Sequence, residues 1–232
     1  MNENPFDTRA RVPVQVENGP IPAIDIKEQE SAVEYLKQVY LLLAASLLMS
    51  VGAGYVGMHT RFAFEHPILL LVLELGAFFL ALYVKNTPTL FLFTGISGFT
   101  IGPIIAIYVS QGMSGAVGQA VFLTGAIFVG MTFYAMTTRR DLSMMGTFLF
   151  AGLIILLVGS LMNLFFHSTA LSFALSAAGA VIFSLYIAWE TQSLRDNPWA
   201  VAPQVAALSM YLNVVNLFLS LLRLLGILGS DD

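Results

Sequence analysis

Residues 204–228 of the sequence read QVAALSMYLNVVNLFLSLLRLLGIL. Arg223 is the only charged side chain in this run of apolar and small polar residues. A helix of this length rises about 37 Å at 1.5 Å per residue, which is enough to cross a hydrocarbon layer of roughly 30 Å. The stretch therefore predicts a transmembrane helix.

The composition of the whole chain supports the same environment. Of its 232 residues, 57% are hydrophobic and only 10% are charged. A soluble domain carries about 25% charged residues, so this chain cannot coat a surface that faces water. The net charge of −4 provides no basic patch for nucleic acid, and the absence of cysteine excludes disulfides and thiol catalysis.

Six further apolar stretches have the length of a membrane span, and short polar loops separate them. The predicted spans before the last are 36–58, 67–84, 88–109, 115–136, 144–166 and 170–190. Asp141 or Ser143 is expected to cap the fifth span. Because the loops are too short for soluble domains, we expect an all-α integral membrane protein that folds as a seven-transmembrane-helix bundle.

The N-terminal segment 1–35 differs from the rest of the chain. It is polar and acidic, it contains four scattered prolines, and it lacks the basic start and apolar core of a secretory signal. We expect a disordered cytoplasmic tail over residues 1–35, followed by a seven-helix transmembrane domain over 36–232.

Lysine and arginine predict the orientation, because they concentrate in cytoplasmic loops. With seven spans, one side of the membrane holds Arg9, Arg11, Lys27, Lys37, Lys85, Arg139, Arg140 and Arg195, and the opposite loops hold only Arg61. The N-terminus is therefore expected in the cytoplasm and the C-terminus outside.

The three histidines fall on the outer side and could form a pH sensor or metal site, but loop histidines are more often ordinary surface residues. We therefore expect no resident metal.

Two glutamates lie within or at the end of predicted spans, where an ionisable side chain is costly and often functional. Glu74 lies about 10 Å below the outer boundary of the second span, so it must face the bundle interior, a cavity or a partner. Glu190 is placed at the end of the sixth span. A structural hydrogen bond is the alternative for each of them.

A polar stripe runs along the seventh span. Ser209, Asn213, Asn216, Ser220 and Arg223 are spaced so that they fall within an arc of about 80° on a helix. Such a stripe either lines a wet pathway or holds helices together by hydrogen bonds. Arg223 is expected to extend toward the membrane surface or to pair with a carboxylate.

Glycines in the third span allow two interpretations. Gly95, Gly98 and Gly102, followed by Pro103, could break this helix beside a cavity, or they could form notches for close helix packing. We favour the interpretation as packing notches.

Motifs of enzyme chemistry are absent from the sequence. It has no His-Glu-x-x-His zinc motif and no glycine-rich phosphate loop, and its histidines lie in loops rather than beside a buried nucleophile. We therefore expect no enzyme and no cofactor, although calcium remains a candidate for transport.

Three segments resemble the Bax inhibitor-1 (transmembrane Bax inhibitor motif) family, in its bacterial, YccA-like branch. They are the Thr-Arg-Arg-Asp-Leu-Ser loop at 138–143, the end of the sixth span at 183–190, and the last span at 208–226. The resemblance extends over nearly the whole chain from the first span onward. It implies a seven-helix fold in which the other helices enclose a central one.

The family also implies a pH-sensitive cation leak, best known for calcium, in which carboxylates from the sixth and seventh helices share a proton. In this sequence Glu190 falls on the first gate position and Asn213 on the second. Glu74 matches a glutamate on the family's pathway, and Lys85 matches a basic residue that engages the gate. Because Asn213 replaces one acid, a proton-sharing acid pair cannot form there.

Some bacterial relatives instead bind the membrane-embedded ATP-dependent protease FtsH and restrain it. Two hypotheses therefore stand. The favoured one is a regulatory protein of the bacterial inner membrane that binds and modulates an FtsH-type protease. The alternative is a pH-sensitive leak channel for calcium or protons.

Overall fold

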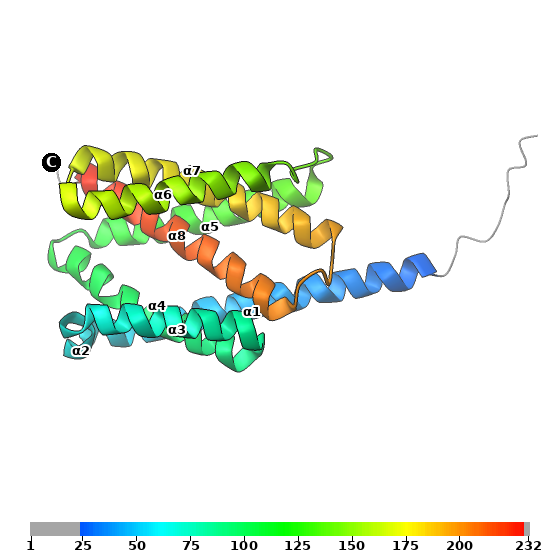
Figure 1. The fold of residues 1–232 in the computed structure, drawn as a ribbon, viewed down its shortest axis with the longest axis horizontal. Helices are drawn as coiled ribbons and strands as arrows, with labels where there is room; N and C mark the ends of the chain where they lie inside the picture. The colour runs from blue at the N-terminus through cyan, green and yellow to red at the C-terminus, as the bar shows by residue number, and fades with distance from the viewer. Residues whose placement is uncertain (1–23, 230–232) are drawn as a thin grey trace, which may run out of the picture.

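The apolar stretches fold as helices because a segment in lipid can satisfy its backbone polar groups only within itself. The computed structural model describes the backbone of residues 24–229 and the side chains from residue 30. Seven of its helices are long and apolar enough to cross a membrane, as predicted. The helices are α1 (Ile24–His59), α2 (Arg61–Glu65), α3 (Pro67–Val84), α4 (Thr87–Ser110), α5 (Ser114–Thr137), α6 (Met145–Phe166), α7 (Thr169–Asp196) and α8 (Pro203–Gly229) (Figure 1).

Two helix boundaries differ from the prediction. α1 begins at Ile24 rather than at residue 36, so part of the segment expected to be disordered is helical. α7 continues to Asp196, so Glu190 lies inside this helix and not at its end. The predicted disorder of residues 1–23 concerns positions outside the described part of the chain.

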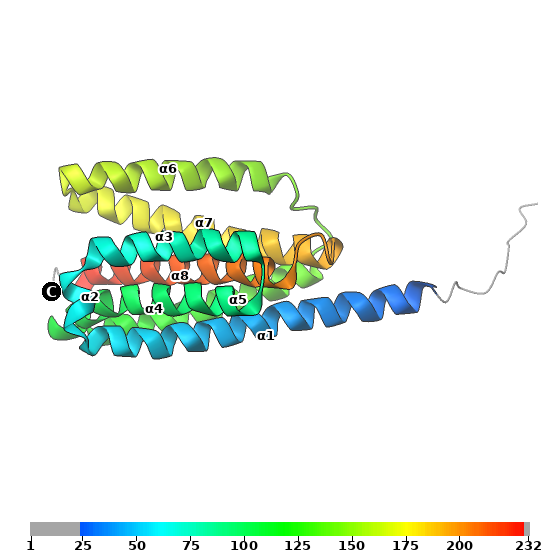
Figure 2. The same ribbon diagram turned by 60° about the horizontal axis from the view of Figure 1, so that its bottom comes forward.

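Because α1 has 36 residues, it is about 54 Å long, which exceeds the roughly 30 Å of the hydrocarbon layer. Figure 2 shows its N-terminal part extending beyond the ends of the other helices. Among the described side chains of α1, from Glu30 onward, the first buried one is Tyr35, and Val33, Glu34 and Lys37 around it are exposed. The bundle therefore begins near Tyr35, and the start of α1 projects from it.

The helices form two groups with α8 between them (Figures 1 and 2). α1, α3 and α4 pack together on one side, and α5, α6 and α7 lie on the other. Buried residues make up 56% of the most apolar window of α8, the largest share among the seven spans. This observation confirms the expected central helix.

α1 and α4 approach each other through glycines. A Cβ atom on Gly98 would collide with the backbone of Ser50, and one on Gly102 would lie 2.5 Å from the carbonyl oxygen of Gly54. α4 stays continuous through Pro103 to Ser110. The interpretation as packing notches is therefore confirmed, and a broken third helix was the wrong alternative.

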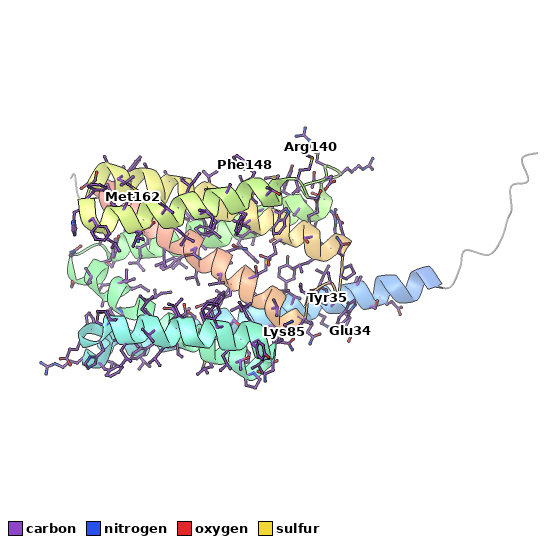
Figure 3. All side chains as sticks on the ribbon, viewed as in Figure 1. Glu34, Tyr35, Lys85, Arg140, Phe148 and Met162 are labelled. Atoms are coloured by element: carbon purple, nitrogen blue, oxygen red, sulfur yellow. The ribbon has the colours of Figure 1, made fainter. Side chains whose placement is uncertain are left out.

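The charged loops gather at one end of the bundle. Lys85 and Arg140 lie at the end from which α1 projects, called here the Arg140 end, and Met162 lies toward the opposite, α2 end (Figure 3). Phe148 and Met162 on α6 are 74% and 48% exposed, as expected for side chains that face lipid. The grouping of basic residues matches the sequence analysis, and which end faces the cytoplasm stays a prediction.

Candidate functional site

Three consecutive polar residues near the Arg140 end of α7 are buried. Glu190, Thr191 and Gln192 are 7%, 0% and 4% exposed. Because successive residues of a helix point about 100° apart, each of them faces a different neighbour. The three side chains connect α7 to α8, to α1 and to the loop between α5 and α6, respectively.

Glu190 bonds to the central helix. The side-chain amide of Asn213 donates a hydrogen bond of 2.6 Å to Oε2 of Glu190, and Ser209, one turn earlier on α8, is a second side-chain partner of this carboxyl group. The structure thus brings together the two residues that the family resemblance places at the gate. Since an amide does not ionise, the pair carries at most one negative charge.

Tyrosines of α1 surround the same region. The hydroxyl groups of Tyr40 and Thr191 are 3.3 Å apart, and Glu190 is close enough to interact electrostatically with Tyr35 and Tyr40. Tyr35 also donates a hydrogen bond of 3.1 Å to the carbonyl oxygen of Val201, in the connection between α7 and α8. The tyrosines therefore attach α1 to α7 and to the connection between α7 and α8.

Gln192 holds the loop between α5 and α6. Its Oε1 accepts a hydrogen bond of 2.7 Å from the backbone N–H of Leu142, and its Nε2 donates one of 2.8 Å to the carbonyl oxygen of Arg140. Arg195 adds a hydrogen bond of 2.7 Å to the carbonyl oxygen of Ala135 at the end of α5. This loop is therefore fixed by side chains of α7.

Asp141 does not cap α6, contrary to the prediction, because the N-cap position is occupied by Met144 and no side chain bonds there. Its Oδ1 instead accepts a hydrogen bond of 2.8 Å from the backbone N–H of Ser143. That bond, with a weaker contribution from the Ser143 hydroxyl, lowers the pKa of Asp141 below its ordinary value.

The other two predicted pathway residues lie apart from the pair. Glu74 is half-buried on α3 and interacts electrostatically with Tyr211 of α8. Lys85 is exposed just after α3, in the left-handed conformation with φ of 55°. Among the described residues no ion pair or hydrogen bond joins either of them to Glu190.

The polar stripe of α8 divides into two parts. Ser209 and Asn213 face Glu190, whereas Asn216 donates a hydrogen bond of 2.8 Å to Leu212 in its own helix. Ser220 packs against Gly179 of α7, and Arg223 is exposed near the α2 end. Only the first part therefore belongs to the site around Glu190.

Thr191, Gln192 and the α1 tyrosines were not identified as site residues from the sequence. The available signal was the run Glu-Thr-Gln in an otherwise apolar helix, since three adjacent polar residues need partners wherever they are buried. The partners come from distant segments, so the sequence pattern alone does not identify them.

The fold and this site define a multi-pass helical membrane protein whose central helix forms a buried polar pair with a neighbouring helix. The family model described as "Inhibitor of apoptosis-promoting Bax1" matches residues 32–230. The chain belongs to this family, the Bax inhibitor-1 family.

Similar proteins occur in bacteria and in animals. The chain is 33% identical over 205 residues to the "Modulator of FtsH protease YccA" of Escherichia coli, covering 87% of this chain and 93% of that protein. It is 36% identical over 206 residues to an "Uncharacterized membrane protein" of Vibrio cholerae, covering 85% and 91%. It is 31% identical over 203 residues to "Protein lifeguard 4" of mouse, covering 82% and 84%.

The comparisons also bear on location. The YccA of another Escherichia coli strain, with the same identity and coverage, is named "Inner membrane protein YccA". Together with the seven apolar helices, these relatives indicate a multi-pass protein of the inner membrane.

Proposed function

We propose that this protein is a non-enzymatic regulator that binds an FtsH-type ATP-dependent protease in the inner membrane. The observation that carries the proposal is the match, over most of both chains, to a protein named as a modulator of FtsH. The family model matches residues 32–230, which include the whole membrane bundle and most of α1.

The projecting part of α1 offers a surface for such a partner. A groove of about 870 Å³ begins on it and continues along α1 into the bundle, and it is lined by Glu30, Val33, Glu34, Lys37, Gln38, Leu41 and Leu42. The groove has both charged and apolar side chains, and Val33 and Leu41 are 66% and 61% exposed. This mixture suits a protein partner at the membrane boundary, where one part of the contact is in water and the other in lipid.

Co-purification tests this contact. Detergent-solubilised FtsH should be retained by the full-length chain and lost when Glu30 and Glu34 are both replaced by arginine. Glu65→Arg is the matched control, because Glu65 is an exposed glutamate in α2 at the opposite end of the bundle. Equal retention by the double variant and the wild type would contradict docking on α1.

Deletion of residues 1–30 is the second test, read out as the rate at which FtsH degrades a membrane substrate. We expect the restraint of the protease to be abolished. Restraint that survives the deletion would exclude presentation through the N-terminal segment. Glu74→Gln and Glu190→Gln should leave the restraint unchanged, because neither side chain lines the groove along α1.

The second candidate is a pH-modulated cation leak, and the burial of the Glu190 carboxyl group within the bundle favours it. Its test is calcium flux into liposomes that contain the purified protein, scanned from about pH 6 to about pH 8. A pH-dependent flux altered by Glu190→Gln would show that one carboxylate suffices to gate a leak. Flux no greater than in empty liposomes would exclude this candidate.

A further inference from the structure

A polar recess opens between α6, α7 and α8 near the α2 end. Two cavities of about 230 Å³ and about 580 Å³ adjoin there and share Leu157, Ser160, Leu175 and Arg223 in their walls. We call the two together the α6–α8 recess. It is separate from the Glu190 site, because neither Glu190 nor Asn213 lines it.

The inner part of the recess holds a hydroxyl group without a partner. Ser176 of α7 lines the smaller cavity and is 2% exposed, and its Oγ makes no hydrogen bond. By contrast, Ser184 on the same helix donates to the carbonyl oxygen of Ala180, one turn earlier. Buried hydroxyl groups are nearly always bonded in proteins. Because Ser176 also lines the cavity, its hydroxyl is available to a ligand with an acceptor atom.

Further polar groups converge on this hydroxyl. Asn216 and Ser220 of α8 line the same cavity. A Cβ atom on Gly179 would lie 2.6 Å from Oγ of Ser220, so the absence of a side chain at Gly179 makes room for that hydroxyl. Ser160 of α6 lies in the wall shared by both cavities. All three helices therefore contribute side chains that can donate hydrogen bonds.

Arg223 supplies a positive charge at the junction of the two cavities. It forms no ion pair within residues 30–229, where the one ion pair is Arg195–Asp196. Arg223 lies six residues before the end of α8 at Gly229, about 9 Å along the axis, so its long side chain can reach the headgroup region. A guanidinium group matches phosphate oxygens with two parallel donors.

The outer part of the recess is apolar. Leu157, Val158, Leu161 and Leu164 of α6 line the larger cavity. They are 59%, 53%, 59% and 67% exposed. In a membrane protein such side chains contact acyl chains. The recess thus combines a cation, inner hydroxyl groups and an apolar flank, at the depth where the headgroup of a lipid meets its chains.

We propose that the α6–α8 recess binds one anionic phospholipid from the leaflet at the α2 end. Arg223 pairs with the phosphate, the inner hydroxyl groups of Ser176 and Ser220 donate to headgroup oxygens, and an acyl chain lies along the leucines of α6. Phosphatidylglycerol fits this chemistry, whereas the cationic choline of phosphatidylcholine would lie against Arg223.

The test is lipid binding by the purified full-length protein in detergent micelles. Phosphatidylglycerol or phosphatidylcholine is added in increasing amounts, and thermal unfolding and native mass spectrometry are recorded. Because a ligand that binds only the folded state raises the unfolding midpoint, phosphatidylglycerol should raise it further and remain bound to a larger fraction of molecules. Equal effects of the two lipids would overturn the proposal.

Substitutions locate the site. Arg223→Gln should weaken phosphatidylglycerol binding by about tenfold or more, and Arg223→Lys, which keeps the charge, should retain part of it. Arg61→Gln is the control, because Arg61 is the other arginine at the α2 end in the described chain and lies outside the recess. Wild-type affinity in Arg223→Gln would overturn the proposal.

Ser176→Ala separates binding from folding. It should weaken lipid binding several-fold without lowering the unfolding midpoint of the lipid-free protein, since the hydroxyl makes no bond there. Ser46→Ala, which removes a second buried hydroxyl without a partner on α1, should leave lipid binding unchanged. Unchanged lipid binding in Ser176→Ala would contradict the role of this hydroxyl.

A final arm distinguishes the source of the phosphate. Inorganic phosphate offers the same anion without acyl chains, so it should raise the midpoint much less than phosphatidylglycerol does. If it reproduces the lipid effect in the wild type and loses it in Arg223→Gln, the recess binds free anions and the lipid proposal fails.

Discussion

The side-chain amide of Asn213 donates a 2.6 Å hydrogen bond to the buried carboxyl group of Glu190, joining α8 to α7. Removal of the donor would leave the carboxyl group buried without this partner, at a cost of about 1–3 kcal/mol. Asn213→Leu should therefore lower the thermal unfolding midpoint. Asn216→Leu should lower it less, because Asn216 bonds only to a carbonyl oxygen of its own helix. A larger loss in Asn216→Leu would contradict this account of the pair.

Asn213→Asp should make the stability of the protein depend more strongly on pH than that of the wild type. Two carboxyl groups at this distance can share a proton, but they repel each other when both are ionised. The variant should therefore lose stability, relative to wild type, as the pH rises from about 5 to about 8. The double variant Glu190→Gln/Asn213→Asp has one acid, as the wild type does, and should lose this additional dependence. Parallel pH profiles of Asn213→Asp and the wild type would refute the prediction.

Gln192→Leu should loosen the loop between α5 and α6. The substitution frees the backbone N–H of Leu142 and the carbonyl oxygen of Arg140, which Gln192 now binds. Because trypsin needs a mobile segment, cleavage after Arg139 or Arg140 should become several-fold faster. Gln111→Leu, at an exposed position at the other end of the bundle, should leave the rate unchanged. Wild-type cleavage rates in Gln192→Leu would show that other contacts hold the loop.

Gly57→Ala should destabilise the contact between α1 and α4. A Cβ atom there would collide with the carbonyl oxygen of Phe99 and lie 3.2 Å from its Cα, and backbone atoms cannot move aside cheaply. Overpacking of this kind costs about 1–3 kcal/mol. Gly52→Ala on the same helix meets nothing within 4 Å and should be tolerated. Equal unfolding midpoints of the two variants would contradict a close α1–α4 contact.

Asp141 should titrate below its ordinary pKa of 3.8, because the backbone N–H of Ser143 bonds its ionised form. A group with a lowered pKa in the folded state contributes stability above its unfolded pKa and loses that contribution as the pH falls through the folded value. Asp141→Asn should thus reduce stability slightly at neutral pH, and this effect should fade as the pH falls below the ordinary pKa of the group. NMR titration of the labelled carboxyl carbon measures the shift directly, and an ordinary value would contradict it.

The membrane spans could be predicted because each is encoded locally by a long apolar run. The errors fall where helices leave the lipid. The start of α1 and the last turn of α7 are polar, so composition changes before the helix ends, although backbone hydrogen bonding continues. In the interior, Pro103 suggested a break that the structure lacks, because surrounding groups compensate for a proline in a buried helix.

The candidate site was predictable only in part. Glu190 and Asn213 were identified from the family resemblance, and the structure places them in contact. The partners of Thr191 and Gln192 lie 151 and 50 or more residues away in the chain, so no local pattern could reveal them. For Lys85 the prediction went too far. The family resemblance suggested a contact with the Glu190–Asn213 pair, but the described residues show no such contact.

The glycine contact between α1 and α4 also determines which parts of the molecule can shift during action. Backbone atoms of the two helices touch at Gly57 and Gly98, so neither can slide past the other without collision. These two helices should behave as one rigid unit in the membrane. A partner, a proton or a lipid that induces a rearrangement should then move α7 and its neighbours. We expect these helices to tilt around α8, relative to the rigid pair of α1 and α4.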